Sequence, residues 1–600
     1  LRRALDSLNA QTFPDWELVV VDDGSPDETP RLLAAYRWDP RVRLIRLPRN
    51  AGLGHALNVA TAAARGRYLA YLPSDDLYAP DHLHRLVALL DARPEVSLAY
   101  GGLRWRYNRS GPTLRGEAPV GREAAALAEP SPARSPEEPL TSGNILALVQ
   151  VMHRREREAE LRWPERVEVE SDSLEAEQWR RMLGMGLEFG YAGAVTCEWT
   201  DHPEQRHKLI ATPDGGLSRF RAWYGIGRGE WLNWQPSWGP RLDERVRYGR
   251  FAIERRLPRP GGLRILLAGS LGFNPERIVA FEERGHHLSG LWSERPEHWD
   301  ATGPFPFGNV VDVPSGRGWI DRVKEAKPDV IYALLNWQAV PLVREIVDAD
   351  LGIPLVFHFK EGPFICQERG LWSSLVRILE RSDGVAFISE ENRTWFDLAL
   401  DGSLDPAKTL LLDGDLPKLD RMGDDWAPKL SALDGEIHTV CTGRPLGLDP
   451  FAEIARHGIH VHVYGEHFHQ YFPNWTREGL ATGHLHLHPN VDPDAWVREL
   501  SRYDAAWFHL FDSANGGDLR RASWDDLNLP ARIGTYAAAG LPWIMKDNRR
   551  SRVAVQDLAE RHGIGVFFSE FEELAVNLRD RSRLREADAN TRASRRLFAF

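Results

Sequence analysis

Short apolar runs alternate with helical patterns through the first part of the chain. Three such runs predict strands over Glu17–Val21, Val42–Leu47 and Leu69–Leu72. Between them, apolar spacing predicts helices over 27–35 and 53–64, with Gly66 just after the second helix. Strand, helix, strand, helix, strand in this order is typical of an open α/β sheet.

Two of the predicted strands end in paired acids. Asp22-Asp23 follows the first strand, and Asp75-Asp76 follows the third. Binding sites in open α/β sheets lie at the carboxyl ends of the strands. Adjacent carboxylates repel each other, and they become favourable when a divalent cation binds between them and a phosphate. A solvated acidic turn with a helix cap before Pro80 is the structural alternative.

The α/β rhythm restarts twice in the second half. Pro258–Gly262 is the clearest break in the chain. Strands are then predicted over Leu263–Ala268, Asp329–Leu335, Pro354–His358, Gly384–Ile388, Glu436–Cys441, Val461–Gly465, Leu485–Val491 and Tyr503–His509. The predicted parts are therefore a domain over 1–215, a linker over 216–262, and two Rossmann-like domains over 263–430 and 431–600.

Three histidines alternate along one of these predicted strands. His484, His486 and His488 would share one face, because strand side chains alternate. No Cys or carboxylate falls at a matching spacing, so a solvated strand edge is favoured over a metal site.

Composition and charge narrow the classes of protein. The chain has 600 residues, 42% hydrophobic and 27% charged, which is typical of several globular domains. A net charge of -11 without a long basic block does not indicate a nucleic-acid-binding protein. Cys197, Cys366 and Cys441 lie far apart and favour a reducing, cytoplasmic location. No apolar run approaches the roughly 18 residues of a membrane span, which leaves peripheral membrane contact open.

Several spaced motifs of the first part resemble one family. SLNAQTFPDWELVVVDDGSPDET and RNAGLGHALNVATAAARGRYLAYLPSDDLYAPDHL are similar to the family 2 glycosyltransferases of the GT-A fold, and the likeness covers roughly residues 1–210. The contacts that it implies for a nucleotide-diphosphate sugar are Asp22, Asp23, Arg49 and Asp75. It also implies that Asp75, Asp76 and His202 hold a Mg²⁺ or Mn²⁺ ion under the diphosphate.

The same resemblance implies a general base and shows two departures. Asp172, upstream of a W-x-R-M helix at Trp179, would take the acceptor hydroxyl's proton in an inverting transfer. Glu170 and Glu175 are alternatives, and a charged helix N-terminus is the structural explanation. Pro73 stands where the family has an Asp. The family's first strand, with its Pro-x-Tyr-Asn type turn, has no counterpart in the printed sequence.

The second half resembles the GT-B fold and the family 4 glycosyltransferases. The matching motif is Pro530, Arg532, Tyr536, Ala538, Gly540 and Pro542. Thr535 stands where the family has a Glu that holds the donor, and Asp525 and Asp526 lie upstream as substitutes. Arg444 would be the best diphosphate contact, because a guanidinium binds phosphate with two parallel hydrogen bonds.

The sequence predicts a cytoplasmic glycosyltransferase with two transferase-like halves. The first half would be an inverting, metal-dependent GT-A enzyme and the second a divergent GT-B enzyme, together moving sugar to a glycan or lipid-linked acceptor. Pro73, Thr535 and the missing first strand favour a rival hypothesis, a non-catalytic scaffold that binds nucleotide sugar or glycan. A hydrolase that uses the acid pairs is a third hypothesis.

Overall fold

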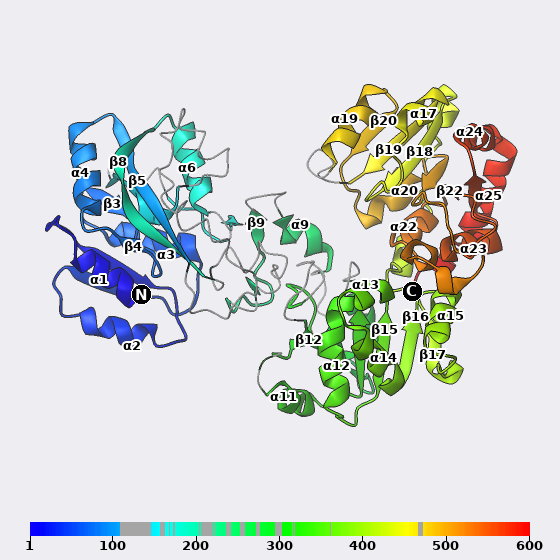
Figure 1. Cartoon of the computed structure of the whole chain (residues 1–600), viewed down its shortest axis with the longest axis horizontal. Helices are drawn as coiled ribbons and strands as arrows, with labels where there is room; N and C mark the ends of the chain where they lie inside the picture. The colour runs from blue at the N-terminus through cyan, green and yellow to red at the C-terminus, as the bar shows by residue number, and fades with distance from the viewer. Residues whose placement is uncertain are drawn as a thin grey trace. The chain divides into compact units, whose positions relative to one another are not determined.

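The computed structural model consists of two compact units. The first comprises Leu1–Gly215 and Phe220–Gly249, and the second contains Arg250–Phe600. Figure 1 shows both units. The structure describes residues 1–107, 146–155, 162–166, 168–171, 174–202, 205, 220–221, 224–235, 242–251, 258–271, 276–293, 303–314, 316, 318–360, 362–465 and 472–600.

The described residues of the first unit form an α/β domain with three separate sheets. Its strands are β1 (Leu18–Asp22), β2 (Val42–Arg46), β3 (Tyr68–Ala70), β4 (Leu77–Tyr78), β5 (Val96–Tyr107), β6 (Val151–Arg154), β7 (Glu170–Ser171), β8 (Glu188–Asp201), β9 (Asn233–Gln235) and β10 (Leu242–Asp243). Its helices are α1 (Arg2–Asn9), α2 (Thr29–Leu33), α3 (Leu53–Ala63), α4 (His82–Ala92), α6 (Leu174–Gly184) and α9 (Glu244–Tyr248). The strand orders are β1-β2, β3-β6-β5-β8-β4 and β10-β9-β7.

Apolar periodicity explains how the helices of this unit pack. In α4, Leu83, Leu86 and Leu90 recur at helical spacing and are buried. They share a core with Val96 and Ala99 of β5. Burial of such a leucine contributes roughly 1.5–3 kcal/mol, so the apolar stripe fixes α4 on the sheet.

The segment predicted as a linker is largely a folded part of the first unit. Leu232 and Trp234 are buried. Arg221 and Glu244 form an ion pair of 2.6 Å between Nη2 and Oε2, and their side chains are 1% and 2% exposed. The Glu244 carboxylate also accepts a hydrogen bond from the Leu232 amide at 2.7 Å. The structure therefore ends the first unit at Gly249, inside the predicted linker of 216–262.

The second unit contains two parallel sheets of the Rossmann type. The first sheet has the order β13-β12-β11-β14-β15-β16-β17 and the second has β20-β19-β18-β21-β22-β23. Their strands are β11 (Arg264–Gly269), β12 (His287–Trp292), β13 (Val311–Asp312), β14 (Val330–Leu335), β15 (Leu355–Phe359), β16 (Gly384–Phe387), β17 (Thr409–Leu411), β18 (Ile437–Thr442), β19 (Ile459–Tyr464), β20 (Leu485–His488), β21 (Ala505–Trp507), β22 (Trp543–Lys546) and β23 (Gly565–Phe568). The predicted α/β fold class, with two Rossmann-like domains after the first domain, is confirmed.

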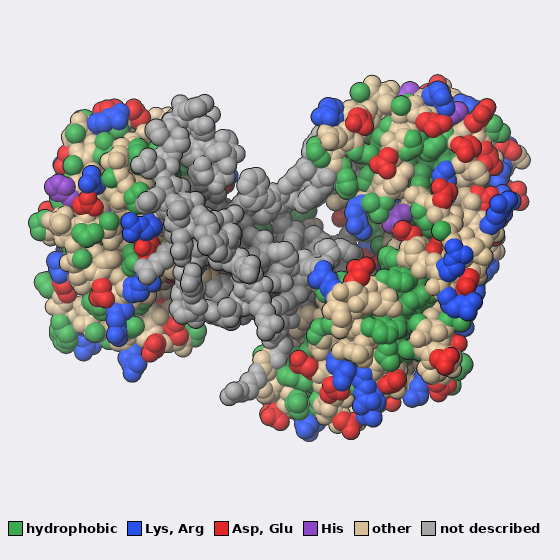
Figure 2. All heavy atoms as spheres, viewed as in Figure 1, with side chains coloured by type: hydrophobic (Ala, Val, Ile, Leu, Met, Phe, Trp, Pro, Cys, Tyr) green, Lys and Arg blue, Asp and Glu red, His purple; other side chains and the backbone are tan. Residues whose placement is uncertain are grey.

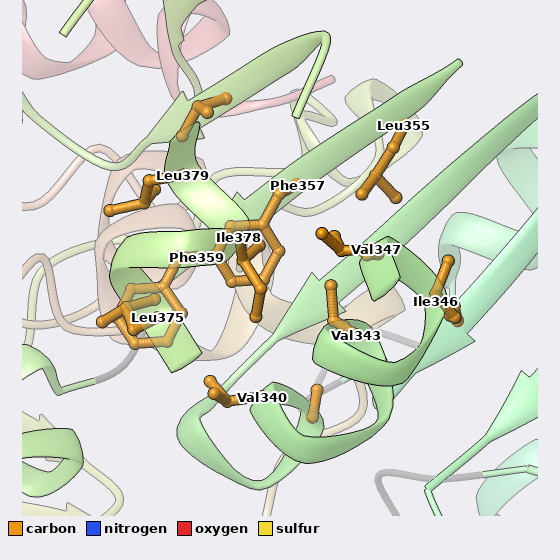
Figure 3. Packing of buried hydrophobic residues seen from close by; sticks show 14 of the residues in the cluster. Val340, Val343, Ile346, Val347, Leu355, Phe357, Phe359, Leu375, Ile378 and Leu379 are labelled. Carbon is orange, nitrogen blue, oxygen red and sulfur yellow. The ribbon is translucent and has the colours of Figure 1, made fainter. Parts of the chain in front are cut away.

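Helices alternate with these strands along the chain. They are α10 (Glu276–Glu283), α11 (Trp319–Ala326), α12 (Val340–Asp348), α13 (Pro363–Glu368), α14 (Trp372–Arg381), α15 (Glu390–Ala399), α16 (Ser431–Asp434), α17 (Phe451–Arg456), α19 (Pro473–Ala481), α20 (Trp496–Leu500), α21 (Trp524–Leu527), α22 (Arg532–Ala538), α23 (Ala554–His562), α24 (Phe571–Arg579) and α25 (Arg581–Ser594). Figure 3 shows α12 and α14 directing apolar side chains onto β15. Val343 and Phe357, both without exposed surface, belong to this core.

The two sheets of the second unit share core and polar contacts. Leu519 and Leu527, from the later part of the chain, belong to the core of the first sheet. Arg421 pairs with Glu276 of α10 at 2.5 Å. The chain end also returns, because the Phe600 carbonyl accepts from the Leu419 amide at 3.0 Å. These contacts make Arg250–Phe600 one compact unit.

Two further features of the structure are the distribution of charge on its surface and the length and polarity of its helices. Acidic and basic side chains intermingle over the face shown in Figure 2. Within the described ranges, every helix is too short or too polar to cross a membrane.

Candidate functional site

The first acid pair has two different roles. Asp22 is 6% exposed. Its carboxylate accepts from the Ser25 amide at 2.9 Å and lies 3.4 Å from Nε of Arg46. Asp22 therefore supports the turn after β1.

Asp23 ties the end of β1 to the start of α3. Its two carboxylate oxygens accept from the amides of Ala51 and Gly52, at 2.7 and 2.9 Å. Burial raises the pKa of Asp23, and the two amide hydrogen bonds oppose that rise. Gly24 adopts a φ of +73°, and a Cβ there would lie 2.6 Å from the carbonyl carbon of Arg49. The close approach of these two loops therefore requires glycine.

The second acid pair meets a histidine from the end of β8. Nε2 of His202 lies 3.0 Å from Oδ2 of Asp75, and the two side chains are 22% and 32% exposed. Gln205 holds this loop, because its side-chain amide donates to the Thr200 carbonyl at 2.8 Å and its Oε1 accepts from the His202 amide at 3.3 Å. The structure therefore brings together two of the three predicted metal ligands.

Asp76 is the buried member of the pair. It is 2% exposed, and its Oδ1 accepts from the Thr200 amide at 2.9 Å. Burial, and then the neighbouring Asp75 carboxylate, raise the pKa of Asp76 to about 8, with Glu175 adding to the rise. A cation beside this pair would favour the ionised form.

A cavity of about 1200 Å³ in the first unit contains these groups. Its polar lining includes Asp23, Asp75, Asp76, Glu175 and His202. Asp22 and Arg49, predicted as contacts of the same ligand, are not part of that lining. Nη1 of Arg49 instead lies 2.5 Å from Oε1 of Glu230. Sequence reasoning missed Gln205, because nothing in its local pattern signals which backbone it holds.

The three candidates for the general base are Asp172, Glu170 and Glu175. Asp172 lies outside the described residues. Glu170 belongs to β7, whose backbone pairs with β9. Glu175, in the first turn of α6, is the alternative base that lines the cavity.

The second unit presents basic and aromatic groups after two strands of its second sheet. Arg444 lies two residues after the end of β18. Its carbonyl accepts a hydrogen bond from Nη2 of Arg532 at 2.7 Å. The Tyr536 hydroxyl donates to the Trp507 carbonyl at 2.9 Å and accepts from the Thr442 amide at 3.0 Å. Arg532 and Tyr536 therefore connect the loops that follow β18 and β21.

Two further residues near this edge are His509, whose pKa is shifted, and Asp526, whose carboxylate is hydrogen-bonded. Burial, followed by Arg532 and Arg444, lowers the pKa of His509 to about 3. Asp526, a predicted substitute for the family's Glu, is 1% exposed and accepts from the amide of Ser523 at 2.8 Å. It caps α21. His509 is a residue that sequence reasoning missed, since a lone histidine after a strand carries no signal.

Six histidines form an array on β18, β19 and β20. The histidine array consists of His438, His460, His462, His484, His486 and His488. Three contacts join ring nitrogens: His438 Nδ1 to His462 Nε2 at 3.0 Å, His462 Nδ1 to His488 Nε2 at 2.9 Å, and His460 Nδ1 to His486 Nε2 at 2.9 Å. Nε2 of His438 also lies 2.9 Å from Oδ2 of Asp434. These rings stack and bond to one another. β20 is the edge strand of the sheet, and the side chains of His484, His486 and His488 are partly exposed.

Comparison with known proteins supports the resemblance seen in the first part. Residues 1–126 match the sequence profile of the family described as Glycosyl transferase family 2. Succinoglycan biosynthesis protein ExoO of Rhizobium meliloti (strain 1021) is 53% identical over 90 residues, which are 15% of this chain and 26% of that protein. Chondroitin synthase of Escherichia coli is 41% identical over 98 residues, 16% of this chain and 14% of that protein. The chain thus spans about a quarter of the first of these relatives and less of the second.

A solved structure is similar to more of the chain. The structure of Anabaena HepE in complex with UDP covers 56% of this chain and 96% of its own, with 13% identity and a TM-score of 0.40. The predicted resemblance to family 2 glycosyltransferases is confirmed for residues 1–126.

Proposed function

We propose that this protein is a glycosyltransferase whose first unit moves a sugar from a nucleotide-diphosphate donor to a glycan or lipid-linked acceptor. The observation that carries the proposal is the meeting of Asp75, Asp76 and His202 in one cavity beyond β3. The match of residues 1–126 to the family 2 profile supports it. The relatives named for succinoglycan and chondroitin synthesis support a growing polysaccharide as the acceptor.

The donor set of this cavity fits a hard divalent cation such as Mg²⁺ or Mn²⁺. Carboxylates and an imidazole are suitable ligands, and a cation would oppose the burial, and then the Asp75 repulsion, that raise the pKa of Asp76. In the part of the chain that the structure describes, no group of three or more His, Cys, Asp or Glu is arranged to hold a metal ion. Diphosphate oxygens and water would therefore complete the ligand set. A bound cation would neutralise the charge that develops on the departing nucleoside diphosphate.

The chain's own residues supply the other roles. Asp23 ties the loop after β1 to the loop before α3, and the donor would bind against these two loops. A carboxylate that accepts the acceptor's proton completes an inverting transfer. Glu175 lines the cavity and Asp172 precedes it in the sequence, so these two residues are the candidates for that carboxylate.

For the second unit, we propose a GT-B module that binds the diphosphate of a donor through Arg444. Its exposed position after β18 supports this role. Thr535 stands in place of a carboxylate, so this module would bind its donor with phosphate contacts rather than with an acidic residue. The three cysteines are free and buried, which suits a protein that works in the reducing cytoplasm.

Calorimetric titration of the full chain tests the proposal. Uridine diphosphate and guanosine diphosphate, each with Mn²⁺, are the probes, and binding by at least one is expected. Asp75→Asn should abolish the cation-dependent part, whereas Asp6→Asn, an acid exposed on α1, is the matched control. Cation-dependent binding that survives Asp75→Asn would refute the metal assignment.

A second assay separates the three classes of function. Labelled nucleotide sugars are incubated with the full chain, with and without an oligosaccharide acceptor. A transferase consumes donor in an acceptor-dependent way, and a hydrolase consumes it without acceptor. Binding without any turnover across a panel of donors and acceptors would favour the scaffold hypothesis.

A further inference from the structure

The segment from Arg162 to Arg166 lies against α3 of the first unit, and we name it the α3 strap. The Asn58 side chain holds its backbone: Nδ2 donates to the Trp163 carbonyl at 3.0 Å, and Oδ1 accepts from the Trp163 amide at 2.8 Å. One turn earlier in α3, a Cβ on Gly54 would lie 1.9 Å from the Pro164 carbonyl oxygen. Because residues four apart share one face of a helix, Gly54 and Asn58 form a single docking face for the strap.

The Trp163 side chain anchors the α3 strap in the core. It is 2% exposed, and its Nε1 donates to the Tyr71 hydroxyl at 3.3 Å. Its ring also meets the ring of Trp179, in α6, edge to face at 5.5 Å between centroids. Aromatic side chains bury a large apolar surface, so Trp163 fixes the strap between α6 and the residue that follows β3.

Arg166, at the end of the strap, reaches the wall of the cavity. It lines the cavity together with Asp23 and Asn50, and its Nη2 donates to Oδ1 of Asn50 at 2.6 Å. Burial raises the pKa of Asp23, its two amide hydrogen bonds oppose that rise, and the positive charge of Arg166 opposes it further. The guanidinium therefore lies beside the two loops that Asp23 ties together.

Several carboxylates line the same cavity. They are Asp23, Asp75, Asp76 and Glu175, and a nucleoside diphosphate is itself an anion that carboxylates repel. A divalent cation beside Asp75 would offset part of this repulsion. A guanidinium in the same lining would offset more of it, because it binds phosphate oxygens through two parallel hydrogen bonds.

We propose that Arg166 binds the diphosphate of the donor and that the α3 strap positions it for this contact. A guanidinium has five N–H donors, so the hydrogen bond to Asn50 orients the group while other donors bind phosphate. The inference deepens the proposed function and rests on it, since it gives the same donor a second positive contact beside the cation. The strap lies outside residues 1–126, so the match to the family 2 profile assigns Arg166 no role.

Nucleotide binding to the full chain tests the role of Arg166. All chains carry Arg444→Gln, so that binding reports on the first unit. With Mn²⁺ present, Arg166→Gln should weaken binding of uridine or guanosine diphosphate by about 10-fold or more in calorimetry. Uridine and guanosine, which lack phosphate, should bind as before in ligand-detected NMR. Equal losses for nucleoside and diphosphate would put the guanidinium on the base or ribose and overturn the inference.

Two further variants separate a phosphate contact from a role in the fold. Arg166→Lys keeps the charge without the two parallel hydrogen bonds, and it should recover part of the affinity while the Tm stays unchanged. Arg162→Gln is the matched control, because this strap residue is 57% exposed, pairs with Glu165 and is not part of the lining. A loss of diphosphate affinity in Arg162→Gln as large as in Arg166→Gln would contradict a specific contact.

Gly54→Ala tests whether the strap positions Arg166. The new methyl group would collide with the Pro164 carbonyl and displace the strap, so diphosphate binding should weaken as in Arg166→Gln. The two changes together should weaken binding little more than either alone, because they act on one contact. If Gly54→Ala unfolds the unit, Asn58→Ala, which removes both hydrogen bonds to Trp163, replaces it. Full additivity in a folded double variant would refute the positioning role.

The same titrations separate this inference from the proposed function. Cation-dependent diphosphate binding that Asp75→Asn abolishes and Arg166→Gln leaves unchanged would overturn the role of Arg166 alone. Diphosphate binding that Arg166→Gln weakens and Asp75→Asn leaves unchanged would support the Arg166 contact and count against the proposed metal site. Absence of any diphosphate binding to the Arg444→Gln chain would overturn both.

Discussion

The carboxyl ends of the strands carry opposite charges in the two units. In the first unit, Asp23 follows β1 and the Asp75-Asp76 pair follows β3, whereas Arg444 follows β18 of the second unit. Under the proposed function, the same α/β geometry would therefore provide two kinds of anion site. Acids cannot hold a diphosphate without a cation between them, but a guanidinium binds phosphate directly. The difference predicts that only the first unit depends on a divalent metal.

Removing divalent cations should have the largest effect. Chelation with EDTA should weaken nucleoside diphosphate binding to the first unit by about 100-fold or more, because juxtaposed like charges cost several kcal/mol. Binding that depends on Arg444 should persist. Titration of Asp75→Asn and Arg444→Gln chains, with and without EDTA, measures each site alone. EDTA-sensitive binding in the Asp75→Asn chain would contradict the prediction that only the first unit depends on a divalent metal.

Acid should affect the two units unequally. In the first unit burial lowers the pKa of His82 and His153, to about 3 and 4. In the second unit burial lowers the pKa of more histidines, among them His462 to about 2, together with His358, His460, His486, His488 and His509. A depressed pKa keeps a ring neutral in the folded state. The stability that this provides is therefore present above the unfolded pKa of about 6.5 and is lost as pH falls below it.

The second unit should consequently unfold at a higher pH than the first. Hydrogen exchange measured separately for each unit between pH 7 and pH 4 checks this order. His462→Gln should shift the acid transition of the second unit downward and leave the first unit unchanged. Equal acid midpoints in both units would contradict the prediction.

Asp23→Asn should destabilise the first unit by about 1–3 kcal/mol, since one amide oxygen cannot replace two carboxylate oxygens that accept from Ala51 and Gly52. Chemical denaturation followed by exchange at α3 measures the loss. Asp6→Asn is the control and should change the free energy of unfolding little. A loss confined to nucleotide binding, with stability unchanged, would show that Asp23 contacts the ligand rather than the loop.

Arg444→Gln should have the smallest effect, about a 10-fold loss of nucleoside diphosphate affinity in the second unit. The side chain is exposed, and only its main-chain carbonyl is held, by Arg532. Arg444→Lys should restore the charge but not the two parallel hydrogen bonds. Unchanged binding in both variants would remove Arg444 from the site.

The local sequence pattern predicts the strands and the acid pairs, but not the long-range hydrogen bonds and ion pairs that hold them in place. The strand at Glu17–Val21 was placed within one residue of β1, because apolar runs bounded by turns are local signals. The Thr200 amide, by contrast, reaches Asp76 across 124 positions of sequence. The sequence likewise gives no sign of the contact between Arg221 and Glu244, which form a buried ion pair only in the folded chain. This pair lies in Phe220–Gly249, which the structure places in the first unit.

Hydrogen bonds run in one direction along a row of rings in the histidine array. If Nε2 of His438 donates to Asp434, then its Nδ1 must accept from His462, whose Nδ1 must in turn accept from His488. Each nitrogen–nitrogen contact holds one hydrogen atom and no more. The row from Asp434 to His488 can therefore take up a single extra proton without losing a hydrogen bond, and a second proton would set two N–H groups against each other. Uptake of a second proton by this row would therefore break a hydrogen bond between neighbouring strands of the β18–β20 edge.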